Sequence, residues 1–243
     1  MSFVDHNEWS KIYGEISTKL LYLNFSRDQE AAEKLSKILL NMSNVITADL
    51  LFERIRGRSY AIVVGCGPNA QKEAQLIRRI KERNFLLVAA DGATKILLDC
   101  DITPDLIVTD LDGNLEALLD ASKNGAIVVF HAHGDNIERI DLIKKFKGPV
   151  VGSTQVEPRP FVYNFGGFTD GDRAIFILQI AGYRRVYVSG FDFEIPYSCP
   201  GKEAVNYNIK KVKLYFAKRL ISMLQQKGID IQEVRYLFGG SSV

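Results

Sequence analysis

Two aspartates that follow an apolar run, Asp110 and Asp112, are the strongest candidates for chemistry in this chain. The run Leu106–Val108 predicts a buried strand of a parallel sheet. If this strand persists through Asp112, both carboxylates lie on the same side. Like charges this close repel one another unless a cation joins them. The pair therefore predicts a magnesium site for phosphate chemistry, with a surface Asx turn at Asp-Gly as the alternative.

A third acid follows another apolar run. Asp91 and Gly92 come directly after the predicted strand Phe85–Ala90 and before a predicted helix. Open α/β sheets bind ligands at the carboxyl ends of their strands, so Asp91 is a candidate ligand for the metal ion or the substrate. Aspartate is also favoured at helix N-caps, and the two roles are compatible.

Two of the three histidines lie in the sequence H-A-H-G-D-N, at the end of the predicted strand Ala126–His133. His131 and His133 share a strand face because they are two residues apart. They could ligate a metal ion, donate hydrogen bonds to phosphate or transfer a proton, and Asp135 and Asn136 follow them. Zinc is not expected, because no further histidine or cysteine has supporting spacing.

A glycine-containing turn joins the predicted strand Tyr60–Val64 to a helix. Its residues Gly65, Gly67, Pro68 and Asn69 loosely match the G-x-G-x-x-A dinucleotide fingerprint. Such glycines let a phosphate or a base approach the backbone. A tight turn without any ligand is the alternative.

Later loops add acidic and basic candidates. The sequence G-G-F-T-D-G-D-R-A contains Asp170, Asp172 and Arg173. Asp172 suits a helix N-cap, and Arg173 can pair with a phosphate or a carboxylate; an ordinary capped loop is the alternative. Asp192 follows a further predicted strand. A late run of lysines usually forms a solvated face, and one of them, such as Lys213, could contact a triphosphate.

These residues need a framework that brings strand ends together. From Ser59 onward, short apolar strands alternate with amphipathic helices, which predicts an α/β fold with a mainly parallel sheet and flanking helices. The predicted strands are 60–64, 85–90, 106–108, 126–133, 149–152, 186–190 and 229–236, and the predicted helices are 70–83, 93–99, 115–123, 137–146, 172–181 and about 203–226.

The segment from about Glu8 to Ile55 is predicted to be helical, because its apolar residues have helical spacing and charged residues fall between them. We find no chemistry in it and expect a helical cap or a contact between copies of the chain. We therefore divide the chain into an N-terminal helical segment, residues 1–57, and an α/β catalytic domain, residues 58–243.

The composition is that of a globular protein. The chain has 243 residues, 47% of them apolar, and a net charge of +2, so a broad nucleic-acid footprint is not expected. Three cysteines without metal-like spacing suit a reducing compartment and no disulfide scaffold. No signal peptide or apolar run of the ~20 residues that cross a bilayer is visible. These features predict a cytoplasmic protein without a membrane or nucleic-acid partner.

Taken in order, the motifs resemble those of the archaeal-type 6-hydroxymethyl-7,8-dihydropterin pyrophosphokinases, which are related to the catalytic domain of thiamin pyrophosphokinases. The resemblance runs from about Arg58 to Leu224. It rests on G-C-G-P-N (65–69), A-A-D-G-A (89–93), P-D-L-I-V-T-D-L-D-G (104–113), H-A-H-G-D-N (131–136), G-G-F-T-D-G-D-R-A (166–174), G-F-D-F (190–193) and K-L-Y-F-A-K (213–218). It implies a catalytic fold like that of the thiamin pyrophosphokinases.

The resemblance also implies magnesium-dependent transfer of diphosphate from ATP to the hydroxymethyl group of a reduced pterin, with release of AMP. Such an in-line transfer depends on positioning and charge neutralisation. Asp110 and Asp112, with Asp91 as a third ligand, would hold magnesium on the triphosphate. His133 or Asp135 would orient or deprotonate the hydroxyl group.

Other roles follow from the same resemblance. His131, Arg173 and a lysine such as Lys213 would neutralise phosphate oxygens. Carboxylates would recognise the pterin's amino and ring N–H groups. These carboxylates are Asp170, Asp172 and Asp192, and the remaining substrate-binding candidates are Gly65, Gly67, Pro68, Asn69, Gly92 and Asn136.

Three other functions stay open. Thiamin pyrophosphokinase differs only in the acceptor. A phosphatase of the haloacid dehalogenase type would use Asp110 as nucleophile and Asp112 as acid–base, but that motif continues with threonine where this chain has Asn114. A nucleotide- or NAD-sensing module would rest on residues 65–70 and leave the aspartates unexplained. The sequence also leaves open whether the product serves a folate or a methanopterin-type cofactor.

Overall fold

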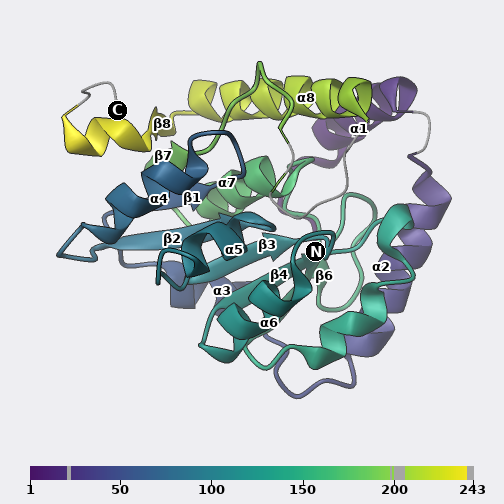
Figure 1. Ribbon diagram of the computed structural model, residues 1–243. Coiled ribbons are helices and arrows are strands. Elements are labelled where there is room, and N and C mark those ends of the chain that lie inside the picture. The colour runs from purple at the N-terminus through teal and green to yellow at the C-terminus, as the bar shows by residue number, and fades with distance from the viewer. Residues whose placement is uncertain (21–22, 198, 200–205, 240–243) are drawn as a thin grey trace.

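The computed structural model describes residues 1–20, 23–197, 199 and 206–239. Within these residues, eight strands form one parallel sheet in the order β6-β5-β4-β3-β2-β1-β7-β8, with helices on both faces (Figure 1). The strands are β1 (Tyr60–Val64), β2 (Phe85–Ala90), β3 (Leu106–Thr109), β4 (Ile127–His131), β5 (Val150–Ser153), β6 (Val162–Tyr163), β7 (Arg185–Ser189) and β8 (Asp230–Glu233). The predicted α/β class with a mainly parallel sheet is confirmed.

The helices cover both faces of the sheet. They are α1 (His6–Lys19), α2 (Phe25–Leu39), α3 (Ala48–Ile55), α4 (Ala70–Arg78), α5 (Ala93–Leu98), α6 (Leu115–Lys123), α7 (Asp170–Ile180) and α8 (Tyr207–Gln226), with short 3-10 turns η1 (Gly134–Asn136), η2 (Ile140–Lys145) and η3 (Val234–Phe238). Helices α1, α3, α7 and α8 pack on one face, and α2, α4, α5 and α6 pack on the other. Because both faces are covered, β2 is buried along its whole length.

Most predicted elements are present, but some differ. The strand expected at 229–236 ends at Glu233, and Val234–Phe238 form a 3-10 helix. Residues 137–146 were expected to form an α-helix, whereas Ile140–Lys145 form a 3-10 helix that buries Ile140 and Ile143, whose spacing of three suits that geometry. The two-residue strand β6 was not predicted, because so short a run has no periodicity. The predicted start of the last helix near Glu203 lies outside the described residues.

The order of the strands reverses at β1. The chain winds outward from β1 to β6, returns through α7 and adds β7 on the other side of β1. The amide of Gly67 donates to the carbonyl of Gly190 at 2.7 Å, so the turns that follow β1 and β7 touch. A Cβ atom on Gly67 would lie 2.5 Å from that carbonyl oxygen, which is why this turn requires glycine. Open α/β sheets bind ligands at such a reversal.

The N-terminal segment packs on the sheet as three helices. Helices α1 and α3 contribute Ile16, Leu51 and other residues to the core over one face, and α2 contributes Leu35 to the core over the opposite face. Residue Val45 makes an isolated bridge with Val150 of β5. Residues 21 and 22, inside the predicted helical stretch, lie outside the described residues. The boundary after residue 57 and the contact between copies of the chain stay predictions.

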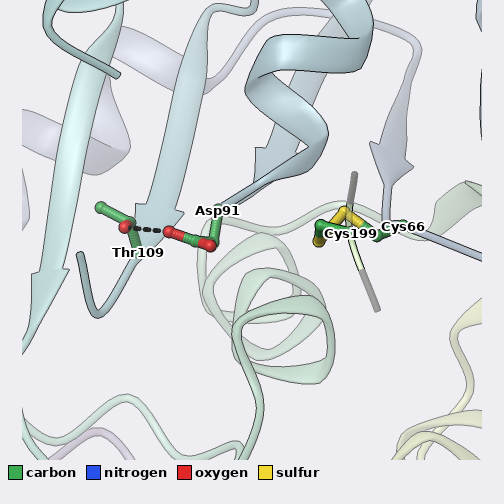
Figure 2. Close-up of a disulfide and its surroundings, with 4 residues drawn as sticks. All are labelled: Cys66, Asp91, Thr109 and Cys199. Carbon is green, nitrogen blue, oxygen red and sulfur yellow. Dashed lines mark hydrogen bonds between the residues drawn. A yellow bond between two sulfur atoms is a disulfide. The ribbon is translucent and has the colours of Figure 1, made fainter. Parts of the chain in front are cut away.

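The expectation that the cysteines form no disulfide is wrong. Cys66, in the turn after β1, is bonded to Cys199, in the segment between β7 and α8, at a sequence separation of 133 (Figure 2). The pairing could not be predicted from spacing, because the fold brings the two turns together at the same sheet edge. Cysteine content therefore gives no argument for a reducing compartment. None of the helices in the described part of the chain is long and apolar enough to cross a membrane.

Candidate active site

Three carboxylates converge at the carboxyl edge of the sheet. Asp91 follows β2, Asp110 follows β3, and Asp170 is the first residue of α7. One oxygen from each lies within 4.8 Å of the other two. This is an all-oxygen donor set of the kind that magnesium prefers.

Asp91 is held in place by its neighbours. Its Oδ1 accepts a hydrogen bond from Thr109 Oγ1 at 2.5 Å, as Figure 2 shows. Its φ of 44° lies in the left-handed region, and its amide donates to the carbonyl of Val108 at 2.8 Å. A Cβ atom on Gly113 would lie 2.4 Å from Asp91 Oδ2, so a larger residue there would displace the Asp91 carboxylate. Gly92, not Asp91, takes the N-cap position of α5, and no side chain caps that helix.

Asp112 lies outside this group of three. Strand β3 ends at Thr109, and Leu111 has a φ of 62°, so the expected alternation does not reach Asp112. The amide of Asp112 instead donates to Asp110 Oδ1 at 3.2 Å, so the Asx turn is made by Asp110 and not by the Asp-Gly pair considered as the alternative. Asp112 still lines the same cavity as Asp110.

Asp170 replaces Asp112 in the group of three. Burial raises the pKa of the Asp170 carboxyl well above its ordinary value, and the negative charges of Asp110, Asp91 and Asp112 raise it further, while Arg173 opposes them. Without a cation, the group therefore favours a bound proton at Asp170. The sequence predicted Asp170 as a substrate-binding residue. It could not place Asp170 beside Asp91, because this proximity depends on where the start of α7 lies relative to the end of β2.

A polar cavity opens beside these carboxylates. We call it the phosphate cavity; it is lined by Leu23, Asp110, Asp112, His131, His133, Asp135, Gln155, Phe168, Thr169, Asp170, Arg173, Lys210 and Lys213. Eight of these residues were predicted as site residues from separate motifs: Asp110, Asp112, His131, His133, Asp135, Asp170, Arg173 and Lys213. The cavity also contains Gln155, which no motif marked. Its cationic side chains come from α7 and α8.

Arg173 is buried and oriented by polar groups. Its guanidinium donates to the carbonyl of Gly167 and to His131 Nε2, both at 3.1 Å, and lies 3.6 Å from Asp170 Oδ1. Because arginine can only donate, His131 Nε2 must accept, and the proton of the ring is on Nδ1, 3.3 Å from Ser153 Oγ. Burial, followed by the charge of Arg173, lowers the pKa of His131 well below its ordinary value. The neutral ring accepts from Arg173 and orients it, and the predicted role of His131 at the phosphate stays a prediction.

His133 lies against Asp110. Its Nε2 is 3.4 Å from Asp110 Oδ2, and its Nδ1 accepts from the amide of Asp135 at 3.3 Å. Asn136 is buried and donates to the carbonyls of Asp110 and His131 at 2.9 and 2.7 Å. Asn136 therefore ties the turn to two strand ends and does not line the phosphate cavity. The Asp135 side chain is half-exposed and does line it.

A second cavity adjoins the first. We call it the aromatic cavity; it is lined by Gly65, Cys66, Gly67, Ala90, Asp91, Thr169, Asp170, Gly171, Gly190, Phe191, Asp192, Phe193, Ile195, Tyr197, Cys199, Lys210, Leu214 and Ala217. Thr169, Asp170 and Lys210 line both cavities. The three carboxylates therefore lie at the border between an apolar and a polar space.

The remaining predicted residues lie elsewhere. Pro68 and Asn69 line a separate depression beside the turn after β7. Asp172 accepts hydrogen bonds from the amides of Phe168 and Thr169, both at 2.7 Å, and forms the capping box of α7. It is fully buried and lines neither cavity. The predicted N-cap role is wrong in position, because Thr169 is the N-cap of α7 and Asp172 is the third helical residue, which closes the capping box.

Comparisons with known proteins identify the family of the chain. The sequence profile of the family described as "6-hydroxymethylpterin diphosphokinase MptE-like" matches residues 36–198. The chain belongs to this family. It is an enzyme of the diphosphokinase type, and the family assignment argues against the phosphatase and the sensing module.

Proteins named 6-hydroxymethyl-7,8-dihydropterin pyrophosphokinase are similar over most of the chain. The one from Pyrococcus furiosus is 39% identical, covering 91% of this chain and 94% of its own length. The one from Methanocaldococcus jannaschii is 40% identical, covering 94% and 99%. A third, from Methanothermobacter thermautotrophicus, is 40% identical over 72% of this chain and 77% of its own.

One solved structure supports the fold alone. The MAf glycosyltransferase from Magnetospirillum magneticum AMB-1 superposes with a TM-score of 0.50 at 16% identity and covers 81% of this chain. This chain spans 35% of that protein's length. At so low an identity, no statement about activity follows.

Proposed function

We propose that this diphosphokinase transfers diphosphate from ATP to the hydroxymethyl group of 6-hydroxymethyl-7,8-dihydropterin and releases AMP. The observation that carries the proposal is the convergence of Asp91, Asp110 and Asp170 between two cavities of different character. A flat ring in the aromatic cavity and a triphosphate in the phosphate cavity would meet at these carboxylates. The names of the relatives supply the acceptor. A cytoplasmic location and a role in folate or methanopterin-type cofactor synthesis stay predictions.

Magnesium fits the donor set at the border of the cavities. Asp91, Asp110 and Asp170 would hold it, with Asp112 close enough to line the same space. The raised pKa of Asp170 has the mutual repulsion of these carboxylates among its causes, which a divalent cation would relieve. When bound, the ion would offset the charge of the triphosphate.

Cationic side chains would bind the phosphate oxygens. Arg173 is fixed by His131 and Asp170 before any ligand arrives, so binding would cost it little side-chain entropy. Lys210 and Lys213 line the same cavity from α8. Neutral His131 would hold the arginine without adding a competing charge.

The aromatic cavity suits the acceptor. The rings of Phe191 and Phe193 lie 6.1 Å apart in an edge-on arrangement, and Asp192 lies between them in sequence. Aromatic walls can stack on a pterin ring, and a carboxylate can accept from its amino and ring N–H groups. The hydroxymethyl group would then point toward the carboxylates, where His133 or Asp135 would orient the hydroxyl or accept its proton.

The decisive experiment measures AMP. Purified protein is incubated with ATP and magnesium, with 6-hydroxymethyl-7,8-dihydropterin, with thiamin, or without an acceptor. We expect AMP in proportion to the pterin diphosphate formed, and none above background in the other two reactions. AMP formed only with thiamin would reassign the acceptor, and AMP formation that needs no acceptor would refute the transfer.

A further inference from the structure

A buried carboxylate in the N-terminal segment reaches the candidate active site. Asp28, on α2, is 1% exposed, although it belongs to helices in which the sequence showed no chemistry. Its Oδ2 accepts from Tyr13 Oη and from Gln155 Nε2, both at 2.7 Å. Its Oδ1 accepts from the backbone amide of Gly134, also at 2.7 Å. Three donors from three separate parts of the chain therefore meet at one side chain.

The contact with Gly134 fixes the turn that carries His133. Gly134 follows His133 directly and begins η1, whose last residue, Asn136, binds the carbonyl of Asp110. A Cβ atom on Gly134 would lie 2.8 Å from the Cβ atom of Arg27, so α2 approaches the turn as closely as a glycine allows. Asp28 thus holds the backbone from which His133 faces Asp110.

The contact with Gln155 reaches the other histidine. Gln155 follows β5, lines the phosphate cavity and interacts through its side chain with His131. His131 in turn accepts the hydrogen bond from Arg173. A single carboxylate outside both cavities is therefore connected to each of the two histidines by one intervening residue.

We propose that Asp28 is a positioning residue for the diphosphate transfer. It lines neither cavity, and it acts by holding the His133 turn and Gln155 in the geometry that faces the triphosphate. The inference rests on the proposed transfer from ATP. The N-terminal segment therefore supplies part of the catalytic framework and is more than a cap.

The test is the isosteric variant Asp28→Asn. An amide keeps the shape of the carboxylate but has only one acceptor oxygen, whereas the three donors bind both oxygens of Asp28. The NH2 group of the amide would therefore face at least one of these donors. We expect kcat to fall by about 10²-fold, as is typical for misplacement by about 1 Å, while the KM for the pterin stays unchanged. Asp49→Asn, which removes an exposed carboxylate from α3, is the matched control and should keep wild-type kinetics.

A second measurement separates positioning from loss of the fold. Ring NMR signals of the three histidines can be followed in ligand-free protein, with His6 as an internal reference on the exposed start of α1. Asp28→Asn should shift the signals of His131 and His133 and leave His6 and the circular dichroism spectrum unchanged. Wild-type kcat in the variant, or lost activity with unshifted His131 and His133 signals, would overturn the inference. No turnover by the wild-type protein would instead refute the proposed function.

Discussion

Carboxylates that meet away from bulk water repel one another, and a fold keeps them together only when other contacts hold each one in place. Thr109 does this for Asp91, and Asn136 does it for the backbone of Asp110. Asp170 is held by the start of α7. These supports are independent of any ligand, so the three oxygens stay arranged for a cation before one binds.

The two aspartates of the D-x-D sequence should differ in importance. Asp110 belongs to the group of three carboxylates, and Asp112 does not. We expect Asp110→Asn to lower kcat by on the order of 10²-fold, because it removes a charged ligand of the metal ion that the proposed transfer places on the triphosphate. Asp112→Asn should cause a smaller loss. Steady-state AMP formation measures both, and equal losses would contradict the assignment of the third ligand to Asp170.

The raised pKa of Asp170 has a consequence for stability. In protein free of divalent ions, the folded state binds the Asp170 proton more tightly than the unfolded chain, whose aspartate pKa is about 3.9. This contribution to stability is present below that value and is lost as the pH rises through the raised pKa. Thermal melts of Asp170→Asn should therefore depend less on pH from about 4 upward than wild-type melts. The same dependence of Tm on pH in the variant and in the wild-type protein would contradict this expectation. Added magnesium should raise the Tm of the wild-type protein more than that of Asp170→Asn.

At the scale of elements, the site depends on two turns that touch. The Gly67–Gly190 hydrogen bond joins the turns after β1 and β7. The Cys66–Cys199 disulfide joins the turn after β1 to the segment that precedes α8. Cys199 also packs against Gly92, where a Cβ atom would lie 2.6 Å from its sulfur. The disulfide therefore packs a wall of the aromatic cavity against Gly92, which follows Asp91 in the chain. Figure 2 shows the disulfide and Asp91.

Reducing this disulfide should loosen the aromatic cavity. We expect dithiothreitol or Cys199→Ser to lower the free energy of unfolding by about 2–4 kcal/mol and to raise the KM for the acceptor. The KM effect follows because both cysteines line that cavity. Cys100→Ser, which changes the buried cysteine outside the disulfide, should still respond to dithiothreitol, whereas Cys199→Ser should not. A KM that is indifferent to reduction would contradict a role for the disulfide in shaping the cavity.

The sequence predicted elements better than it predicted contacts between them. Apolar runs placed β1, β2 and β3 because a buried parallel strand has a local signature. The left-handed φ of Leu111 ended the alternation that would have placed Asp112 beside Asp110, and no local pattern marks such a residue. The Cys66–Cys199 pairing and the place of Asp170 both depend on strand order, which hydrophobic periodicity does not encode.

At the scale of the whole molecule, the N-terminal helices and the sheet share their cores. Tyr183, between α7 and β7, donates from its hydroxyl to the carbonyl of Ile55 at the end of α3, at 2.5 Å. Helix α1 runs beside α8 (Figure 1), and Lys227, just beyond α8, pairs with Glu8 at 2.9 Å. Asp28 adds a buried polar contact to the same framework. These contacts argue that the two parts unfold together.

The single tryptophan tests this directly. Trp9 lies on α1, is 5% exposed, and donates from Nε1 to the carbonyl of Gln155 at 2.7 Å. Its fluorescence therefore reports whether the N-terminal helices are docked beside the phosphate cavity, whereas far-UV circular dichroism reports on all helices. In a denaturant titration we expect one transition with the same midpoint for both signals, because a cooperative unit unfolds as a whole. A fluorescence change at lower denaturant than the circular dichroism change would instead identify residues 1–57 as a separately unfolding segment. Activity should then disappear with the fluorescence transition, because Asp28 belongs to that segment.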